Sequence, residues 1–491
     1  MAAETRDRGN ASGLSASRIA RGTIWAALDN WTQQLSQLVA FIVIGNIVGP
    51  EVFGIMAMAM LYVLFAHALL VDSFAEAIVQ RLDVDREHLE AAFWFLAIVG
   101  VAATGISFLA ARWVAYGFSQ PVLTEVVRWL SISFVIVGPS SLLQSKLRRE
   151  FDFRALAGRS ILAYGGAAAV GILLAQLGYG LWSLVVYQLS LRALDFLALL
   201  CISRWRPRPR FSWRHFRDLV AFGLGNIGNR LLGLLAEHAD RILVGYFLGP
   251  LAIGLYAIAN RVVDGASNAL AGVMHTVAFS TFARLQDDRK QLHEAILSAT
   301  HLASLIVFPV FAGLGLVAPV LVDLVLGDEW RPAGTIITIL SVACVAGFTF
   351  PASYLLVSAL MALGRADQVF LMGIVTVVLR TGFCLWAVQY GVLAVAVAIT
   401  AFEFVAVPIR FYLVNRQIKL DFSAYFRNMG PAAVATLLMA VCVFTVHLLT
   451  RSMDPMAAVV LLVAAGVASY SAALLVFARP SLRLVIGALR R

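Results

Sequence analysis

The sequence reads GNIVGPEVFG over residues 45–54 and GYFLGPLAIG over residues 245–254. Both stretches follow the pattern G-x-x-x-G-P-x-x-x-G, and each lies between two long apolar segments. The copies start 200 residues apart (245 minus 45), whereas solenoid repeats recur every 20–50 residues, roughly. A single recurrence at this distance predicts two homologous helical bundles, an internal symmetry typical of membrane transporters.

The composition is that of a membrane protein. Of 491 residues, 61% are hydrophobic and 13% are charged, and the mean hydropathy is +0.85. Soluble domains carry about 25% charged residues. Apolar runs of about 20 residues, enough to cross about 30 Å of hydrocarbon, recur along the whole chain, while a β-barrel would show short alternating segments. We therefore expect an all-α integral membrane protein.

The apolar runs predict fourteen transmembrane helices. Six form an N-terminal bundle at 23–202, six form a C-terminal bundle at 219–413, and two more follow at 414–478. Polar, basic segments stand at 1–22 and 479–491. The expected spans are 23–48, 52–73, 91–113, 124–145, 157–177, 181–202, 219–248, 251–279, 293–318, 335–362, 368–389, 391–413, 429–449 and 457–478.

Basic residues between the spans lie almost entirely on one side. The densest group, RWRPRPR at 204–210, belongs to a linker at 203–218, where Pro207 and Pro209 prevent a regular helix. The opposite loops hold essentially Arg331 and Arg451. By the positive-inside rule, both termini are expected in the cytoplasm. These basic residues also produce the net charge of +10. Because they flank the spans, we expect them to contact anionic lipid headgroups and do not expect a nucleic-acid-binding domain.

Ionisable side chains inside spans are costly and mark a candidate site. In span 219–248, Arg230, Glu237 and Arg241 lie at positions i, i+7 and i+11, within an arc of about 40°. Asn226 extends this stripe by one turn. Shifting by the repeat distance gives an amide-rich face in the first span, formed by Asp29, Asn30, Gln33 and Gln37. The two bundles thus predict an asymmetric cavity, charged on one wall.

Other charges inside the spans leave alternatives open. Arg192 with Asp195, and Arg261 with Asp264, are spaced i, i+3 and could simply neutralise each other. Arg380 and Glu403 have no opposite charge nearby in sequence, so each needs a distant partner, a water-filled cavity or a ligand.

Asp72 and Glu76 lie four residues apart at the inner end of span 52–73. Two carboxylates on one helix face could carry a proton or a sodium ion. A water-exposed rim accounts for them as well.

Motifs for catalysis are absent from the sequence. It contains no G-x-S-x-G or Walker A pattern, and its eight histidines and four cysteines have no metal-ligand spacing. The first 22 residues lack a short apolar segment with a cleavage site, so no signal peptide is expected. We predict no catalytic residue, metal or cofactor, and hence no enzyme.

Several short motifs occur in order from the first span to about residue 370. Besides the repeated turn they include LRREFDFRAL at 147–156, DRILVG at 240–245, LGDEWRPA at 326–333 and ALGRAD at 362–367. Their order resembles the polysaccharide-transporter (Wzx-like oligosaccharide flippase) branch of the multidrug/oligosaccharidyl-lipid/polysaccharide exporter superfamily. The resemblance implies two six-helix bundles in a V shape that work by alternating access, plus two C-terminal helices.

The resemblance also implies a substrate, a polyprenyl-pyrophosphate-linked oligosaccharide flipped across the bacterial cytoplasmic membrane for extracellular polysaccharide or lipopolysaccharide synthesis. Pathway polymerases and glycosyltransferases are then expected partners. The pyrophosphate requires cations, and guanidinium groups bind oxyanions in a fork. The candidates are Arg230, Arg241, Arg261 and Arg380, with Arg192 a weaker one. The amides of Asn30, Gln33, Gln37 and Asn226 are candidates for sugar hydroxyls.

Three other functions compete with this one. A proton- or sodium-coupled drug or cation antiporter of the same superfamily would have an acidic cavity, and Asp29, Asp72, Glu76 and Glu237 keep it open. A lipid II flippase is a second possibility. A membrane glycosyltransferase would need a large extracytoplasmic loop, and the longest expected here, at about 319–334, is short.

Overall fold

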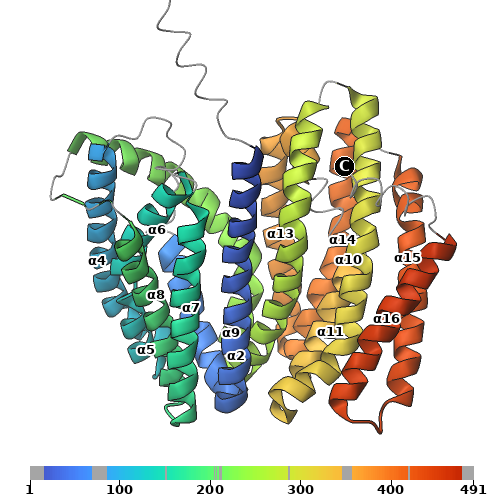
Figure 1. The fold of residues 1–491 in the computed structure, drawn as a ribbon, viewed down its shortest axis with the longest axis horizontal. Helices are drawn as coiled ribbons and strands as arrows, with labels where there is room; N and C mark the ends of the chain where they lie inside the picture. The colour runs from blue at the N-terminus through green and yellow to red at the C-terminus, as the bar shows by residue number, and fades with distance from the viewer. Residues whose placement is uncertain are drawn as a thin grey trace, which may run out of the picture. The chain divides into compact units, whose positions relative to one another are not determined.

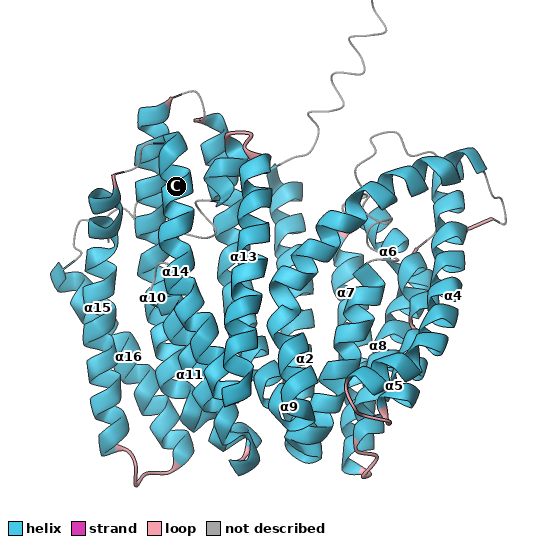
Figure 2. Cartoon of the chain, turned by 180° about the vertical axis from the view of Figure 1, so that it is seen from behind, coloured by secondary structure: helices cyan, strands magenta, loops and turns pink. Residues whose placement is uncertain are grey.

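The computed structural model describes residues 16–68, 86–149, 152–203, 205, 207–208, 213–285, 288–345, 357–418 and 421–477. Within these ranges every regular element is a helix (Figure 2). Eleven helices of the described part are long and apolar enough to cross a membrane. The prediction of an all-α membrane protein is confirmed.

The repeated motif interrupts two very long helices at equivalent points. Helix α2 (Ala16–His67) has a non-helical residue at Gly49, with φ 78° and ψ 168°. Helix α9 (Trp213–Arg284) has one at Gly249, with φ 80° and ψ −172°. Glycine adopts positive φ without a steric penalty, and the proline that follows lacks the N–H that would continue the helical bonding. The two copies therefore share a backbone conformation as well as a sequence.

The two motifs also touch each other. The last glycine of each copy lies against the proline of the other: a Cβ on Gly54 would overlap the Pro250 carbonyl oxygen, and one on Gly254 would overlap the Pro50 carbonyl oxygen. Phe53 packs edge-on against Trp330 with ring centroids 5.7 Å apart. Because Gly49–Gly54 belongs to the same compact unit as residues 232–491, this crossing lies inside one unit.

Two compact units make up the chain. The first comprises residues 1–48 and 55–231. Besides most of α2 and the start of α9, it contains α4 (Arg86–Gly117), α5 (Leu123–Ser131), α6 (Phe134–Arg149), α7 (Phe153–Gln176) and α8 (Leu181–Ile202). Helix α7 packs along α8, and α4 packs on α5 and α6 (Figure 1). Leu96, Leu143, Leu199 and Trp205 belong to one buried apolar cluster of this unit.

The expected span 124–145 is broken near its start. Helix α5 ends at Ser131 and α6 begins at Phe134. At the break, the hydroxyl of Ser133 donates to the Leu130 carbonyl over 2.6 Å, and the amide of Ile132 bonds only three residues back. Serine side chains compete in this way for backbone groups and weaken a helix locally.

The second unit comprises Gly49–Gly54 and residues 232–491. After α9 it contains α10 (Arg289–Leu326), η2 (Asp328–Trp330), α11 (Arg331–Val345), α13 (Ala366–Ala387), η3 (Val388–Tyr390), α14 (Val392–Ile418), α15 (Phe422–Leu449) and α16 (Pro455–Phe477). Helix α10 packs on α11, α15 and α16, while α14 packs on α11 and α13 (Figure 1). The two C-terminal helices thus attach to α10.

One expected loop is wrong. Residues 319–334 were expected between spans, but α10 continues to Leu326, η2 follows at once, and α11 begins at Arg331. The prolines at 309 and 319 lie inside α10. Membrane helices tolerate proline because neighbouring helices and local adjustments satisfy the freed carbonyl groups.

Candidate functional site

The ionisable side chains of the second unit pair with one another between helix segments. Arg241 forms an ion pair with Asp264, and the two residues lie on opposite sides of the Gly249–Pro250 break in α9. Arg380 of α13 lies 3.3 Å from Asp240 and donates to the Ala236 carbonyl over 3.3 Å. Unpaired charges are very costly away from water, so each pair holds two segments together.

Asp240 is the centre of this network. Its side chain is almost fully buried, and its Oδ2 accepts from the Tyr256 hydroxyl over 2.5 Å as well as from Arg380. Asn260 in turn donates to the Tyr256 carbonyl over 2.8 Å. The Asp240 carboxylate thus links the two parts of α9, before and after Gly249, to helix α13.

Both arginines of the network retain unused capacity. The Arg241 side chain is 20% exposed and that of Arg380 is 21% exposed. The Nε–H of each is buried and makes no hydrogen bond within the described part of the chain. A guanidinium has five N–H donors, so either one can bind an oxyanion while it keeps its carboxylate.

The other predicted site residues on α9 differ in how exposed their side chains are. Arg230 is exposed and Arg261 is half-buried. Glu237 is exposed, with Oε1 3.8 Å from His238 Nε2. The side chain of Asn226 lies outside the described part of the chain.

The first unit holds a buried cluster that the sequence analysis did not anticipate. Arg159 of α7, 3% exposed at its side chain, lies 3.2 Å from Asp195 of α8 and 3.5 Å from Asp29 of α2. Asp195 also accepts from Gln144 over 3.2 Å. The expected partner of Asp195 was Arg192, three residues away; the ion pair that the structure shows joins different helices. An arginine inside the apolar run 157–177 was the signal for this cluster.

The amides of the first span meet this cluster in part. Gln33 donates to Asp29 over 3.0 Å and to Ser160 over 3.2 Å, and it accepts from the Tyr164 hydroxyl over 3.2 Å. Ser160 also donates to Asp29. Asn30 is exposed and Gln37 is half-buried. Gln33 is therefore already committed to protein partners.

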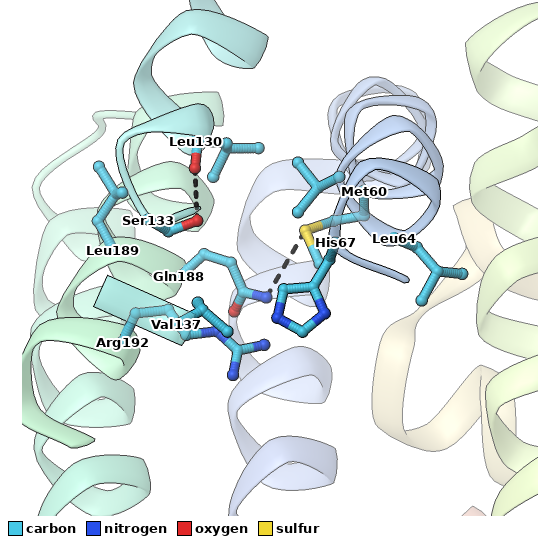
Figure 3. Close-up of a pocket in the computed structure, with 10 residues that line it drawn as sticks. Met60, Leu64, His67, Leu130, Ser133, Val137, Gln188, Leu189 and Arg192 are labelled. Atoms are coloured by element: carbon cyan, nitrogen blue, oxygen red, sulfur yellow. Dashed lines mark hydrogen bonds between the residues drawn. The ribbon is translucent and has the colours of Figure 1, made fainter. Parts of the chain in front are cut away.

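Arg192 lines a cavity in the same unit. The cavity has a volume of about 90 Å³, and its polar side chains are His67, Ser133, Gln188 and Arg192. Figure 3 shows Gln188 and Arg192 beside His67, with Gln188 Nε2 3.6 Å from Met60 Sδ. Pockets for drug-sized ligands have about 300–1,000 Å³, so this space suits one small polar group, such as a phosphate, and not a sugar chain.

The expected site for ion coupling falls on residues that the structure does not describe. Asp72 and Glu76, the candidates for ion coupling, lie outside the described residues. Among the residues that are described, no three histidine, cysteine or acidic side chains are grouped so as to hold a metal ion.

Large apolar side chains are exposed on the described part of the chain and ion pairs join its helices, as in a polytopic membrane protein. Solved structures share the fold. The lipid II flippase MurJ in an inward closed conformation superposes with a TM-score of 0.74 at 13% identity, covering 94% of this chain and 100% of that one. A multidrug resistance MATE family transporter of the MOP superfamily, in its inward-facing conformation, gives 0.64 at 19% identity, covering 80% and 98%. The chain therefore shares its fold with these two solved structures.

The family follows from sequence. The family model described as polysaccharide biosynthesis protein matches residues 43–335, and the chain belongs to that family. The teichuronic acid biosynthesis protein TuaB of Bacillus subtilis (strain 168) is 29% identical over 464 residues, covering 92% of this chain and 94% of TuaB. The succinoglycan biosynthesis transport protein ExoT of Rhizobium meliloti (strain 1021) is 26% identical, covering 77% and 75%. The predicted family is confirmed, and none of these names denotes an enzyme.

Proposed function

We propose that this protein is a flippase for a polyprenyl-pyrophosphate-linked oligosaccharide in the bacterial cytoplasmic membrane, acting in extracellular polysaccharide or lipopolysaccharide synthesis. The observation that carries the proposal is the pair of partly exposed arginines, Arg241 and Arg380, inside the spans of a chain of the polysaccharide biosynthesis family. The relative named as a transport protein and the flippase that shares the fold support it.

The chemistry of the task fits these residues. Transfer of a pyrophosphate or a hydroxyl group into hydrocarbon without a hydrogen-bonding partner costs roughly several kcal/mol of free energy per group. Arg241 and Arg380 are each about one-fifth exposed, so part of each guanidinium is accessible to a phosphate oxygen, and the cavity at Arg192 offers a guanidinium and an amide. Arg230, Arg261 and the amides of Asn30, Gln37 and Asn226 are further proposed contacts.

The proposed architecture has fourteen spans. Two of the eleven candidate spans, Leu28–His67 and Arg230–Leu270, contain 40 and 41 residues. At 1.5 Å per residue each is about 60 Å long, twice the hydrocarbon thickness. Counting each as two gives thirteen, and the expected span 335–362 completes the number. We propose bundles at 23–202 and 219–413, the linker 203–218, two added helices at 414–478, cytoplasmic termini and alternating access.

Energy coupling is proposed at Asp72 and Glu76, because two carboxylates four residues apart in the sequence could take up a proton or a sodium ion. Polymerases and glycosyltransferases of the same pathway are the proposed partners.

Translocation in proteoliposomes tests the function. A fluorescent polyprenyl-pyrophosphate oligosaccharide is placed in the inner leaflet, and its exposure to an external quencher is followed with time. We expect movement that depends on the protein and falls at least about ten-fold in Arg241→Gln, since a charged hydrogen bond contributes about 1.5–3 kcal/mol. Arg365→Gln, an exposed arginine outside the network, is the matched control.

Two outcomes contradict the proposal. If the protein moves none of several lipid-linked glycans, the flippase assignment is wrong. Proton-driven efflux of an organic cation in the same vesicles assigns the antiporter function instead.

A further inference from the structure

A second, larger pocket lies in the second unit, at the end where α10 and α15 finish and α16 begins. It has a volume of about 450 Å³, within the range of small-molecule sites. Figure 1 shows the turn between α15 and α16 at the end of the unit away from the start of α10. The polar lining residues are Asp323, Arg331, Thr335, His447, Thr450 and Arg451.

The carboxylates around this pocket already have partners. Arg331 Nε lies 2.9 Å from Asp323 Oδ1, and Nη2 lies 2.8 Å from Asp328 Oδ1. These contacts raise the pKa of Arg331, chiefly through the hydrogen bond to Asp323, so its charge is fixed. Asp454 accepts from the amides of Met456 over 3.1 Å and Ala457 over 3.2 Å, at the start of α16.

Arg451 and His447 are the nitrogen donors of the pocket that have no acceptor in the described part of the chain, and the exposed hydroxyl of Thr335 is a further polar group there. Within the part of the chain that the structure describes, neither side chain makes a hydrogen bond or an ion pair. Arg451 is exposed in the turn after α15, and His447 is half-buried on the last turn of that helix. A guanidinium and an imidazole are therefore available to one ligand.

The positive-inside rule does not explain Arg451, because the sequence predicts that the loops on its side are nearly free of basic residues. The two arginines that do occur there, Arg331 and Arg451, are 120 residues apart (451 minus 331) and line the same pocket. Helix ends of membrane spans lie at the depth of lipid headgroups. The available anion at that depth is a phosphate.

We propose that this pocket binds the phosphate of a lipid headgroup. Arg451 forms two parallel hydrogen bonds to the phosphate oxygens, and His447, at the end of α15, donates another hydrogen bond to the phosphate. Arg331, held by Asp323 and Asp328, forms the opposite rim, and Val320 and Met453 contact the first carbons of the lipid. The site goes beyond the proposed flippase function, which places substrate on Arg241 and Arg380, and it gives α15 and α16 a role in holding lipid at the surface.

Lipid binding to the purified full-length protein tests this site. Native mass spectrometry counts bound phosphatidylglycerol, phosphatidylethanolamine and polyprenyl pyrophosphate in separate titrations. The variants are Arg451→Gln and His447→Gln. Arg365→Gln is the matched control, because Arg365 is an exposed arginine just before α13 that does not line the pocket. Size-exclusion profiles and thermal unfolding establish that each variant is folded.

We expect the affinity of the tightest lipid to fall about ten- to hundred-fold in Arg451→Gln, the loss of one charged hydrogen-bonding partner. His447→Gln should lose less, and Arg451→Lys should retain part of the affinity because it keeps the charge without the fork. A loss confined to polyprenyl pyrophosphate assigns the pocket to the carrier lipid. A loss confined to the two phospholipids assigns it to phospholipid phosphates, and an equal loss for all three assigns it to lipid phosphates in general.

Wild-type affinity in folded Arg451→Gln overturns the proposal, as does an equal loss in Arg365→Gln. Because the readout is binding, it is independent of transport. A protein that moves no lipid-linked glycan but binds phosphate lipid through Arg451 disproves the proposed function and leaves this site in place.

Discussion

Arg159 is the side chain with the greatest consequence for stability in the first unit. It is buried and lies within ion-pair distance of both Asp29 and Asp195, from two other helices. Removing it leaves two carboxylates in a site closed to water. A buried pair of this kind contributes little relative to apolar packing, but breaking it by deleting one partner costs about 3–5 kcal/mol.

We therefore expect Arg159→Met to lower the thermal unfolding temperature of the detergent-purified protein strongly, and Arg159→Lys to lower it less. Arg154→Met is the matched control, because Arg154 is exposed on the same helix. Equal stability of Arg159→Met and the control would mean that the carboxylates find other partners or protons.

The Arg241–Asp264 pair makes a prediction for transport. Asp264 is 45% exposed at its side chain, so it competes with an incoming anion for Arg241. Asp264→Asn should lower the substrate concentration needed for half-maximal transport by up to about five-fold, since partly exposed pairs contribute about 0.2–1 kcal/mol. Arg241→Gln should raise that concentration. Steady-state transport in proteoliposomes measures both, and a shift in the same direction for the two variants contradicts the competition.

At the scale of elements, the crossing of the two G-P-x-x-x-G turns is the most restrictive contact. Added Cβ atoms on Gly54 and Gly254 would both overlap carbonyl oxygens of the opposite copy. Backbone atoms cannot rotate away, so helix α2 or α9 must move to accept a methyl group. The repeated glycine thus serves close packing between the repeats, while the glycine before each proline serves the turn.

Gly54→Ala and Gly254→Ala are each expected to destabilise the protein by about 1–3 kcal/mol, the usual cost of overpacking. Gly265→Ala is the control, because it lies in α9 with open space around its Cβ position and gains helix propensity. Thermal unfolding and the yield of monodisperse protein measure the difference. Normal stability in both turn variants would show that the crossing is loose.

At the scale of the whole molecule, the distribution of basic residues predicts which ends of the helices face the cytoplasm. Single cysteines replacing Arg365 or Arg451, in a chain whose Cys201, Cys344, Cys384 and Cys442 are changed to alanine, test it. An impermeant maleimide added to intact cells should label the Arg451 position only, and the Arg365 position should react after permeabilisation. The reverse pattern would place both termini outside.

The class of the protein, its helical build and its internal repeat could all be predicted from the amino-acid sequence. These properties follow from local quantities: hydropathy over about 20 residues, and the effect of a glycine and a proline on a helix. The break at Gly49 and Gly249, and the family to which the chain belongs, were predictable for that reason.

Which charges form ion pairs depends on the folded arrangement of the helices. The spacing allowed Asp195 to pair with Arg192 and Asp264 with Arg261, and the structure shows that Asp195 pairs with Arg159 on another helix and Asp264 with Arg241 across the helix break. It also brought Arg331 and Arg451 to one pocket. The rotation of each helix about its axis sets these pairings, and that rotation is fixed by packing against neighbouring helices, which a periodic pattern along one segment does not encode.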